Sequence, residues 1–450
     1  MISHTSRRGL RAWQPLLVLI AVLGLSLSLT ACDEVPTEDT SGAAAANTSN
    51  VVCADDDGSL MLPEGFCASV VADSLGTVRH ITVNENGDVY AALRGEPEGG
   101  GIVALRDTDG DGTADVEERF GASGGTGIGL HNGYLYFAPD SAVWRYELSE
   151  GELVPTGERE VVASGFPAQR QHAVKPFAFD GDGNMFVNVG APSNACQEEM
   201  RTAGSPGLDP CPQLERQGGI WRFSDSQLGQ TQQDDGTRYA TGIRNAVALT
   251  WNDASGSLFV VQHGRDQLHM LWPDRFTQQE GTDQPAEEFV AVEEGDDFGW
   301  PYCYYDWQKD QKVLAPEYGG DGDEVGRCDQ FEDPIVAFPG HWAPNDVLFY
   351  QGDHFPMKYR NGALIAFHGS WNRTPRQDGY IVAFVPFSDG SPSGEYETFA
   401  DGFAGEGDWR PQRPGDAEYR PMGLAVGPDG SLYISDSQQG RIWRVVYRGQ

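Results

Sequence analysis

Residues 362–373 read Gly-Ala-Leu-Ile-Ala-Phe-His-Gly-Ser-Trp-Asn-Arg, an apolar strand that runs directly into a polar turn. The turn gathers His368, Asn372 and Arg373 around Trp371. An imidazole for proton transfer, a guanidinium for a carboxylate and a flat aromatic ring together suit a planar anionic ligand. The alternative is a strand end whose polar groups bond only to neighbouring loops.

The strand in this stretch belongs to a recurring pattern, in which a Gly precedes a short apolar or aromatic strand. Six instances begin at Gly87, Gly133, Gly183, Gly256, Gly362 and Gly430. Strands rich in Trp and Arg follow three of them, at residues 143–146, 220–223 and 442–445. Short alternating strands between Gly-containing turns, with almost no helical periodicity, favour antiparallel sheets. Six such repeats predict an all-β fold, a six-bladed β-propeller; a pair of sandwiches and a β-helix are the alternatives.

The spacing of the repeats predicts where the propeller carries long loops. The intervals from Gly183 to Gly256 and from Gly256 to Gly362 exceed the roughly 40–50 residues of one blade. We expect the extra residues to form long inserted loops on one face, where function usually resides. The last strand, which ends near Arg448, is expected to complete a blade begun near Leu60 and so to close the ring.

The N-terminus has the features of a targeting segment. Three arginines among the first eleven residues precede an apolar run over residues 16–29, and the tetrapeptide Leu-Thr-Ala-Cys that ends at Cys32 resembles a bacterial lipobox. These features predict a signal peptide over residues 1–31 and an exported lipoprotein, facing the periplasm or displayed on the cell surface, that the lipid on Cys32 alone holds on the membrane. A plain secretory peptide and an uncleaved anchor are the alternatives, and the export route and the membrane stay open.

Charge and composition divide the rest of the chain. Residues 32–52 are acidic and lack periodicity, which predicts a flexible tether, and residues 53–450 are predicted to form the propeller domain. The 450-residue chain has a formal net charge of −36, and removing residues 1–31 takes away three arginines and no acid, which leaves −39. Such a surface repels nucleic acid and anionic lipid, so we expect no nucleic-acid partner.

The seven cysteines become an even six when Cys32 is assigned to lipid, and an even number in an exported protein favours disulfides. The sequence alone does not choose among the possible pairings. Proximity along the chain suggests Cys53 with Cys67, Cys196 with Cys211, and Cys303 with Cys328. No Cys-x-x-Cys occurs, so neither a zinc ribbon nor a thioredoxin-like site is indicated.

An acidic loop over residues 107–118 matches the template of a calcium-binding loop, with oxygen ligands and a central Gly at the specified positions. The predicted ligands are Asp107, Asp109, Asp111, Thr113, Asp115 and Glu118. A strand precedes this loop instead of a helix, so we expect a structural calcium on a blade connection. The alternative is an empty acidic turn.

Basic and imidazole side chains recur beside the strands of several repeats, in a chain that is otherwise acidic. If the blades wind around a common axis, equivalent ends of different repeats face one mouth. We therefore expect a shared site at this mouth. Its candidate residues are Arg79, His172, Arg244, Asn245, Arg265, His368, Arg373 and Arg420. For any single one of them, a structural hydrogen-bonding role is an equal alternative.

Several motifs in this chain resemble the sorbosone dehydrogenase family, a branch of the soluble quinoprotein sugar dehydrogenases. They are Leu-Pro-Glu-Gly-Phe at 62–66, Gly-Ile-Arg-Asn at 242–245, Phe-Gly-Trp-Pro-Tyr-Cys at 298–303 and the run over 338–373. The likeness covers residues 62–447, nearly the whole of the predicted domain.

The resemblance implies a propeller that holds pyrroloquinoline quinone (PQQ) and calcium on its axial face and transfers hydride from a sugar to the quinone. It implies that His172 takes the proton of the substrate hydroxyl and that the backbone carbonyls of Gly264 and Arg265 hold the catalytic calcium. Cofactor contacts are implied at Arg79, Arg244, Asn245, His368, Arg373 and Arg420. The three carboxylates of this cofactor suit guanidinium partners.

Two positions depart from the family pattern. Lys175 stands where an Arg is expected after the histidine, and Asn345-Asp346 replaces an apolar residue and a Gly. The first change affects the grip on the cofactor and the second affects substrate access, or both mark a propeller that has lost catalysis.

The sequence thus predicts a PQQ-dependent oxidoreductase that oxidises an aldose, an aldehyde sugar or a related alcohol and passes electrons to a membrane quinone or a cytochrome. One alternative is a non-catalytic lipoprotein propeller that binds a polysaccharide or a protein partner through aromatic loops such as residues 300–307. Another is a hydrolytic propeller that uses calcium to activate water.

Overall fold

The computed structural model describes residues 48–95, 98–374, 377–405 and 411–449. Contacts along the chain separate Met1–Gly42 from Ala43–Gln450, and every described residue belongs to the second unit. The predicted signal peptide and the lipidated Cys32 lie outside the described residues. Within the described ranges, no helix is both long enough and apolar enough to cross a bilayer.

Six sheets, each with four antiparallel strands and one with a short fifth strand added, make up most of this unit, and they confirm the predicted six-bladed β-propeller. Blade 1 contains β2 (Val78–Val83), β3 (Val89–Leu93), β4 (Ile102–Arg106) and β5 (Val116–Phe120). Blade 2 contains β6 (Gly127–His131), β7 (Tyr134–Ala138), β8 (Val143–Glu147) and β9 (Glu160–Ser164), with β13 (Gln230–Thr231) added in parallel to β9. Blade 3 contains β10 (Phe177–Phe179), β11 (Asn184–Val189), β12 (Gly219–Ser224) and β14 (Thr237–Thr241).

The second half of the ring follows the same plan. Blade 4 contains β15 (Ala248–Asn252), β16 (Ser257–Gln262), β17 (Glu287–Val292) and β20 (Val336–Phe338). Blade 5 contains β21 (Pro344–Phe349), β22 (Ala363–His368), β23 (Tyr380–Val385) and β26 (Glu397–Ala400). Blade 6 contains β27 (Pro421–Val426), β28 (Leu432–Asp436), β29 (Ile442–Tyr447) and β1 (Phe66–Ala72).

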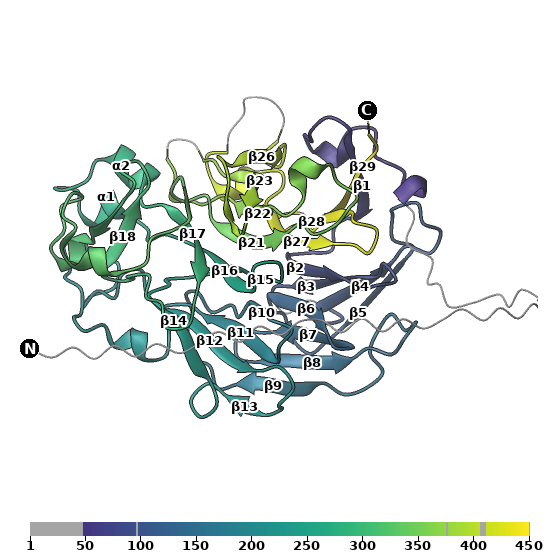
Figure 1. Ribbon diagram of the computed structural model, residues 1–450, viewed down its shortest axis with the longest axis horizontal. Helices are drawn as coiled ribbons and strands as arrows, with labels where there is room; N and C mark the ends of the chain where they lie inside the picture. Colours follow the sequence, from purple (N-terminus) through teal and green to yellow (C-terminus); the bar gives the residue numbers. More distant parts are fainter. Residues whose placement is uncertain (1–47, 96–97, 375–376, 406–410, 450) are drawn as a thin grey trace, which may run out of the picture. The chain divides into compact units, whose positions relative to one another are not determined.

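The innermost strands form a closed circle. Strands β2, β6, β10, β15, β21 and β27 contact one another in this order, and β27 contacts β2 (Figure 1). Closure comes from β1, which pairs antiparallel with β29 from Phe66↔Tyr447 onward, so the first strand of the domain completes the last blade. The predicted ring closure is therefore confirmed.

The recurring Gly-strand pattern marks one position in every blade. The six strands it predicts are the second strands β3, β7, β11, β16, β22 and β28. At the turn before β7, Asn132 and Gly133 have φ angles of +48° and +79°, the left-handed pair that a tight hairpin requires. The local turn chemistry thus sets the start of the second strand, and alternating side chains then pack against the neighbouring blades.

The hydrophobic core lies between neighbouring blades. Between blades 5 and 6, Trp443, Leu364 and Phe355 are almost completely buried. Between blades 1 and 2, Tyr90 and Phe137 are buried to the same degree. Equivalent apolar clusters occupy the other four blade interfaces, so each sheet is held by its two neighbours.

Three long insertions fall within the two long intervals between repeats and confirm the loops that the spacing predicts. Residues 190–218 join β11 to β12 and contain the 3₁₀ turn η3 (Pro212–Glu215). Residues 263–286 join β16 to β17 and contain the helices α1 (Leu268–Leu271) and α2 (Gln278–Asp283). Residues 293–335 carry the hairpin of β18 (Cys303–Asp306) and β19 (Gln311–Leu314), and the labels α1, α2 and β18 lie together in Figure 1.

The remaining short elements lie in connections. They are β24 (Phe387–Ser388), β25 (Ser391–Pro392), η1 (Thr48–Asn50), η2 (Asp57–Ser59), η4 (Pro316–Tyr318), η5 (Gly326–Gln330), η6 (Met357–Tyr359) and η7 (Pro414–Asp416).

The end of the predicted tether needs a correction. Residues 48–52 were expected to be flexible, but Val51 is buried and the guanidinium of Arg448 donates to the carbonyl of Thr48 at 2.6 Å. Val52 N also donates to the carbonyl of Asp111 at 2.6 Å. The packed part of the chain therefore begins before Cys53.

Candidate active site

One end of the propeller collects the polar turns of several blades. In each blade the second strand ends where the first begins, because the two are antiparallel neighbours. His263 follows the end of β16, His368 ends β22, and Arg244 and Asn245 precede β15. We call this end of the ring the site face. The predicted convergence of distant polar residues follows from this topology.

A hollow of about 410 Å³ opens on the site face. Three predicted site residues, His172, Arg244 and Asn245, line it together with Trp371, whose side chain is 53% exposed. The full lining is Gln171, His172, Arg201, Arg244, Asn245, His263, Asp266, Gln267, Ser370, Trp371 and Asn372. We refer to this cavity as the His172 hollow.

His172 is held by its backbone and by one ring nitrogen. Its φ is +51°, and Nδ1 lies 2.6 Å from the carbonyl oxygen of Ala191. A carbonyl only accepts, so Nδ1 carries the proton and Nε2 keeps its lone pair. Burial, followed by the charge of Arg244, lowers the pKa of His172 to about 3. The imidazole is therefore neutral at pH 7, the form that accepts a proton.

Arg244 and Asp266 form a buried ion pair beside His172. Arg244 Nη2 lies 2.8 Å from Asp266 Oδ2, and Arg201 Nη2 lies 2.8 Å from the same oxygen. Asn372 Nδ2 donates to Asp266 Oδ1 at 2.6 Å. Burial raises the pKa of Asp266, but Arg244 and its other cationic neighbours outweigh burial, so the net pKa is lowered. Asp266 is therefore ionised, and its carboxylate accepts hydrogen bonds from the guanidinium groups of Arg244 and Arg201.

Neither Asp266 nor Arg201 was among the predicted site residues. Asp266 follows Gly264 and Arg265 directly, so its place next to two predicted residues could have identified it as a site residue. Arg201 lies in the insertion after β11, and nothing in its local sequence indicates that it reaches Asp266.

A second group of cations lies on the site face around His368. Arg420 Nε donates to the carbonyl of His368 at 3.0 Å and Nη2 donates to that of Gly369 at 2.8 Å, while His368 Nε2 lies 2.6 Å from Ser437 Oγ. Burial, then Arg94 and Arg420, lower the pKa of Arg79 to about 9, and Arg79 Nε has no hydrogen-bond partner in the described residues. Predicted residues Arg79, His368 and Arg420 are thus brought together.

Lys175, which departs from the family pattern, is also on this face. Its side chain is fully buried and Nζ donates to the carbonyl of Ala173. Burial lowers its pKa to about 8. In the described part of the chain, no carboxylate lies within ion-pair distance of Lys175, Arg79 or Arg420.

The other departure lies on the innermost strand of blade 5. The carbonyl of Asn345 lies 2.7 Å from His80 Nε2. Asp346 is buried, and its carboxylate accepts from the backbone N–H groups of Leu424 and Val347. These two residues therefore tie β21 to β2 and β27.

Two candidate residues, Arg265 and Arg373, place their side chains outside the His172 hollow. Arg265 forms a buried ion pair with Glu317, which comes from the insertion between β17 and β20. Arg373 Nη1 donates to the carbonyl of Gly340 at 2.7 Å, and Nη2 lies 3.3 Å from Asp283 of α2. Arg265 still lies beside Arg244 and His263, but acceptors in the insertions hold both side chains away from the lining of the His172 hollow.

The carbonyl of Gly264, expected to hold a catalytic calcium, accepts from Arg244 Nη1 at 2.8 Å. This oxygen therefore faces a guanidinium. The amide N–H of the same residue donates to the buried carboxylate of Glu287 at 3.0 Å.

The predicted calcium loop joins β4 to β5, apart from the lining of the His172 hollow. Carboxylate oxygens of Asp107, Asp109 and Asp115 lie within 4.8 Å of one another. Asp111 Oδ1 accepts from Thr113 N at 2.8 Å, and Glu118 lies within β5 opposite Ala104. Three of the predicted ligands are therefore gathered, and neither Asp111 nor Glu118 belongs to this group.

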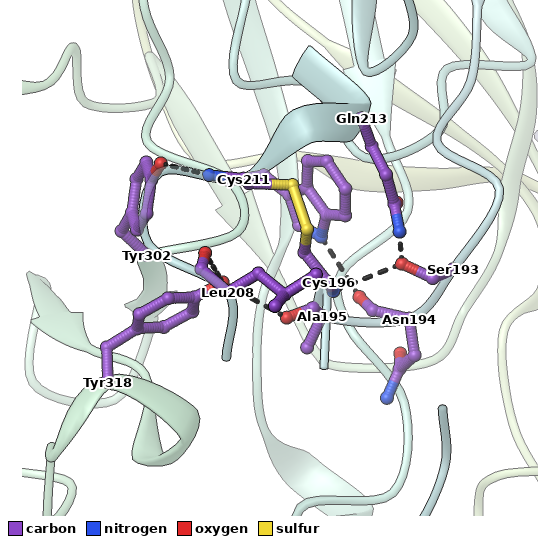
Figure 2. The surroundings of a disulfide bond; sticks show 10 residues. Ser193, Asn194, Ala195, Cys196, Leu208, Cys211, Gln213, Tyr302 and Tyr318 are labelled. Carbon is purple, nitrogen blue, oxygen red and sulfur yellow. Dashed lines mark hydrogen bonds between the residues drawn. A yellow bond between two sulfur atoms is a disulfide. The ribbon is translucent and has the colours of Figure 1, made fainter. Parts of the chain in front are cut away.

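The structure contains the three disulfides suggested by sequence proximity, Cys53–Cys67, Cys196–Cys211 and Cys303–Cys328. Cys196–Cys211 closes part of the insertion after β11. Figure 2 shows it surrounded by hydrogen bonds from Ser193 Oγ to Gln213 Oε1 and from Cys211 N to the Tyr302 hydroxyl. The disulfide and these hydrogen bonds thus hold the insertion that carries Arg201 in place.

A family model described as TrAA12-like matches residues 60–448. A PQQ-dependent pyranose dehydrogenase of Coprinopsis cinerea is 26% identical over 243 residues, which cover 45% of this chain and 30% of that protein. The chain spans at most 48% of the length of the curated relatives that it matches.

Solved structures resemble the whole described propeller. The holo PQQ domain of pyranose dehydrogenase from Coprinopsis cinerea has a TM-score of 0.68 at 20% identity, covering 86% of this chain and 97% of that one. The calcium structure of the Trichoderma reesei carbohydrate-active enzyme of family AA12 has a TM-score of 0.69 at 18% identity, covering 89% and 99%. At these identities the likeness establishes the fold.

Proposed function

Since the chain belongs to the TrAA12-like family, we propose that it is a PQQ-dependent oxidoreductase that oxidises an aldose, an aldehyde sugar or a related alcohol. The observation that carries this proposal is a set of buried cations on the site face, Arg79, Lys175 and Arg420, which form no ion pair with a carboxylate of the described residues; Asp140 acts on the first two only from beyond ion-pair distance. Buried positive charge without a counter-ion is costly. A ligand with several carboxylates would offset that cost.

The residues present fit such a ligand. Among the described residues, Arg79 Nε is a buried donor with no acceptor and Asn245 Oδ1 is a buried acceptor with no donor. Arg79, Lys175, Arg244, Asn245, His368 and Arg420 would hold PQQ through its carboxylates and ring oxygens. When bound, PQQ supplies a quinone that accepts hydride.

His172 is the residue we assign as the base. Its Nδ1–H is fixed on the Ala191 carbonyl, so Nε2 is the atom that takes the proton of a substrate hydroxyl. The low pKa of about 3 reflects burial and the charge of Arg244. Anionic charge on the site face would raise this pKa and make the imidazole a stronger base.

The outer part of the His172 hollow suits a sugar. Gln171, Gln267 and Asn372 offer amide groups for hydroxyls, and Trp371 offers an exposed ring for stacking on a pyranose face. Electrons would leave to a membrane quinone or a cytochrome.

The catalytic calcium at Gly264 and Arg265 remains a prediction. The Gly264 carbonyl faces the guanidinium of Arg244, an arrangement that disfavours a cation at that oxygen. We therefore assign calcium no part in the proton transfer at His172.

Export of the protein remains part of the proposal. Three disulfides among the described residues suit an oxidising compartment. Lipid attachment at Cys32 would then hold the domain at a membrane surface. Mass spectrometry of the membrane fraction, with Cys32→Ser as the comparison, tests this assignment.

Reconstitution tests the proposed activity. The purified domain is titrated with PQQ, with and without calcium, and dye reduction is measured with a panel of neutral sugars and aldehydes. We expect micromolar or tighter PQQ binding and sugar-dependent dye reduction. Absence of PQQ binding would end the proposal, whereas binding without turnover would favour the non-catalytic propeller.

A further inference from the structure

Asn194 lies in the insertion after β11, two residues before Cys196, and its side chain is fully buried. It does not line the His172 hollow. Every polar atom of its side chain nevertheless contacts one of two residues that do, Arg244 and Asp266.

The side chain of Asn194 forms hydrogen bonds with the main chain of Asp266. Asn194 Oδ1 accepts from Asp266 N at 2.8 Å, and Asn194 Nδ2 donates to the carbonyl of Asp266 at 2.9 Å. One side-chain amide therefore satisfies both backbone groups of Asp266, much as a neighbouring strand would. This fixes the direction in which the Asp266 carboxylate leaves the chain.

Asn194 also grips Arg244. Its backbone carbonyl accepts from Arg244 Nε at 3.2 Å, and its Oδ1 accepts from Arg244 Nη2 at 3.1 Å. The same backbone carbonyl accepts from the indole of Trp300 at 3.0 Å. The guanidinium plane of Arg244 is thus set by Asn194 before any ligand arrives.

A guanidinium has five N–H donors, and the contacts of Arg244 account for four. Nε–H bonds to Asn194, both Nη2 donors bond to Asn194 and Asp266, and one Nη1 donor bonds to Gly264. Within the described residues, a single N–H on Nη1 is left for a ligand. Arg244 therefore offers an anion one donor from a fixed position instead of a two-pronged fork.

The surroundings of Asn194 are rigid. Ser193 Oγ accepts from Cys196 N at 3.1 Å and donates to Gln213, and the Cys196–Cys211 disulfide closes this loop (Figure 2). The hydroxyl of Tyr318 lies 3.4 Å from the carbonyl oxygen of Ala195 and 3.3 Å from that of Leu208, so its one proton is shared between them. The insertion thus holds Asn194 from both sides along the chain.

We propose that Asn194 is a positioning residue, which locks Arg244 and Asp266 so that one Nη1 donor of Arg244 is presented to an anionic ligand. That this ligand is PQQ rests on the proposed function. That Asn194 sets the orientation of Arg244 does not.

The test combines equilibrium binding with crystal structures. PQQ dissociation constants are measured by titration calorimetry for the wild type, Asn194→Ala, Arg244→Met and the double variant, without substrate. Asn194→Ala is expected to weaken binding by about 10-fold. Because Asn194 acts through Arg244, the double variant should bind no more weakly than Arg244→Met alone, a non-additivity that a merely structural role would not produce.

Asn252→Ala is the matched control. Asn252 is a buried asparagine at the far end of β15, where its Oδ1 accepts from Ala254 N, and its replacement should leave PQQ binding within about twofold of the wild type. If Asn194→Ala does not fold, Asn194→Ser removes the amide with a smaller cavity.

The ligand-free crystal structure of the variant decides the matter independently of PQQ. A rotated Arg244 guanidinium supports the proposal, even if the wild type fails to bind PQQ and the proposed function falls. An unmoved Arg244, or effects of the two substitutions that simply add, overturns it.

Discussion

His172 owes its assigned role to the different partners of its two ring nitrogens. Nδ1 is tied to a carbonyl at 2.6 Å, so substitution removes Nε2 as a base and leaves the cations of the site face in place. We predict that His172→Ala lowers turnover of the PQQ-loaded enzyme by about 100-fold. The PQQ dissociation constant should stay within about threefold.

Steady-state dye reduction and calorimetry check this prediction. The control is His131→Ala, because His131 is partly buried and bonded to Asp225 but lies at the end of β6 remote from the site face. Near-normal turnover of His172→Ala would move the base to His263 or His368.

Glu287 predicts a pH dependence of stability. Its carboxylate accepts from Gly264 N and Ala343 N, but burial dominates and raises its pKa from 4.5 to about 8. The folded protein therefore keeps a proton that the unfolded chain has lost. Stability from this group is present below pH 4.5 and is lost as pH rises through 8.

Between pH 6.5 and 8 the wild type should lose roughly 1–2 kcal/mol of unfolding free energy from this group, at about 1.4 kcal/mol per pH unit. Glu287→Gln should lack this slope. The histidines titrate near pH 6.5 in the unfolded chain, but they contribute equally to variant and wild type, so the difference between the two slopes reports Glu287. Urea unfolding at several pH values measures the slope, and equal slopes for variant and wild type would contradict the assignment.

The residues that sequence reasoning placed well are those that the blade repeat itself carries to the site face. His172, Arg244 and Asn245 stand next to blade strands, so the fold carries them to the site face. Arg265 and Arg373 stand in equivalent positions, yet the first pairs with Glu317 and the second with acceptors beside α2. Those partners come from insertions with no repeat pattern, and a single sequence does not show which charge an insertion will bring.

At the scale of elements, the calcium-loop template predicted only part of the ligand set in the loop from β4 to β5. Asp107, Asp109 and Asp115 converge, whereas Glu118 is held in β5 by pairing with Ala104. The template assumes a helix after the loop, and here a strand directs the last carboxylate differently. The helices α1 and α2 escaped detection because four and six residues are too few to display a helical period.

Calcium should stabilise the domain through this loop. Repulsion among three close carboxylates is relieved by a divalent cation, so we predict that millimolar calcium raises the melting temperature by about 2 °C or more. Asp109→Asn should abolish most of this shift. Asp321→Asn is the control, because Asp321 is an exposed acid that caps a turn. Equal shifts in both variants would place the calcium elsewhere.

For the molecule as a whole, the ring was predictable because the signal repeats. Six Gly-marked strands each fix a turn and a period of two, and only a closed ring of sheets gives every one of them two apolar neighbours. The order of closure was also visible, since the last strand at residues 442–447 had no later partner and β1 supplied it. The insertions follow no repeat, and their disulfides and ion pairs join distant segments. Sequence reasoning therefore predicted where the insertions lie in the chain but not how they fold.

Closure of the ring depends on Trp443. This side chain on β29 is fully buried, packs edge-on against Phe403 and Tyr419 at centroid distances of 5.5 and 5.1 Å, and donates from Nε1 to the carbonyl of Gly58 at 2.9 Å. Its strand joins the N-terminal β1 to the last blade. Trp443→Ala should therefore cost about 3–5 kcal/mol of unfolding free energy.

Because every blade depends on its two neighbours, opening one interface should destabilise all six together. We predict that Trp443→Ala lowers the melting temperature by about 5 °C or more in a single transition, followed by circular dichroism and calorimetry. Trp371→Ala, which removes an indole that is 53% exposed, should change it by about 1 °C or less. A separate early transition in the Trp443 variant would show instead that blade 6 unfolds on its own and that the ring does not act as one cooperative unit.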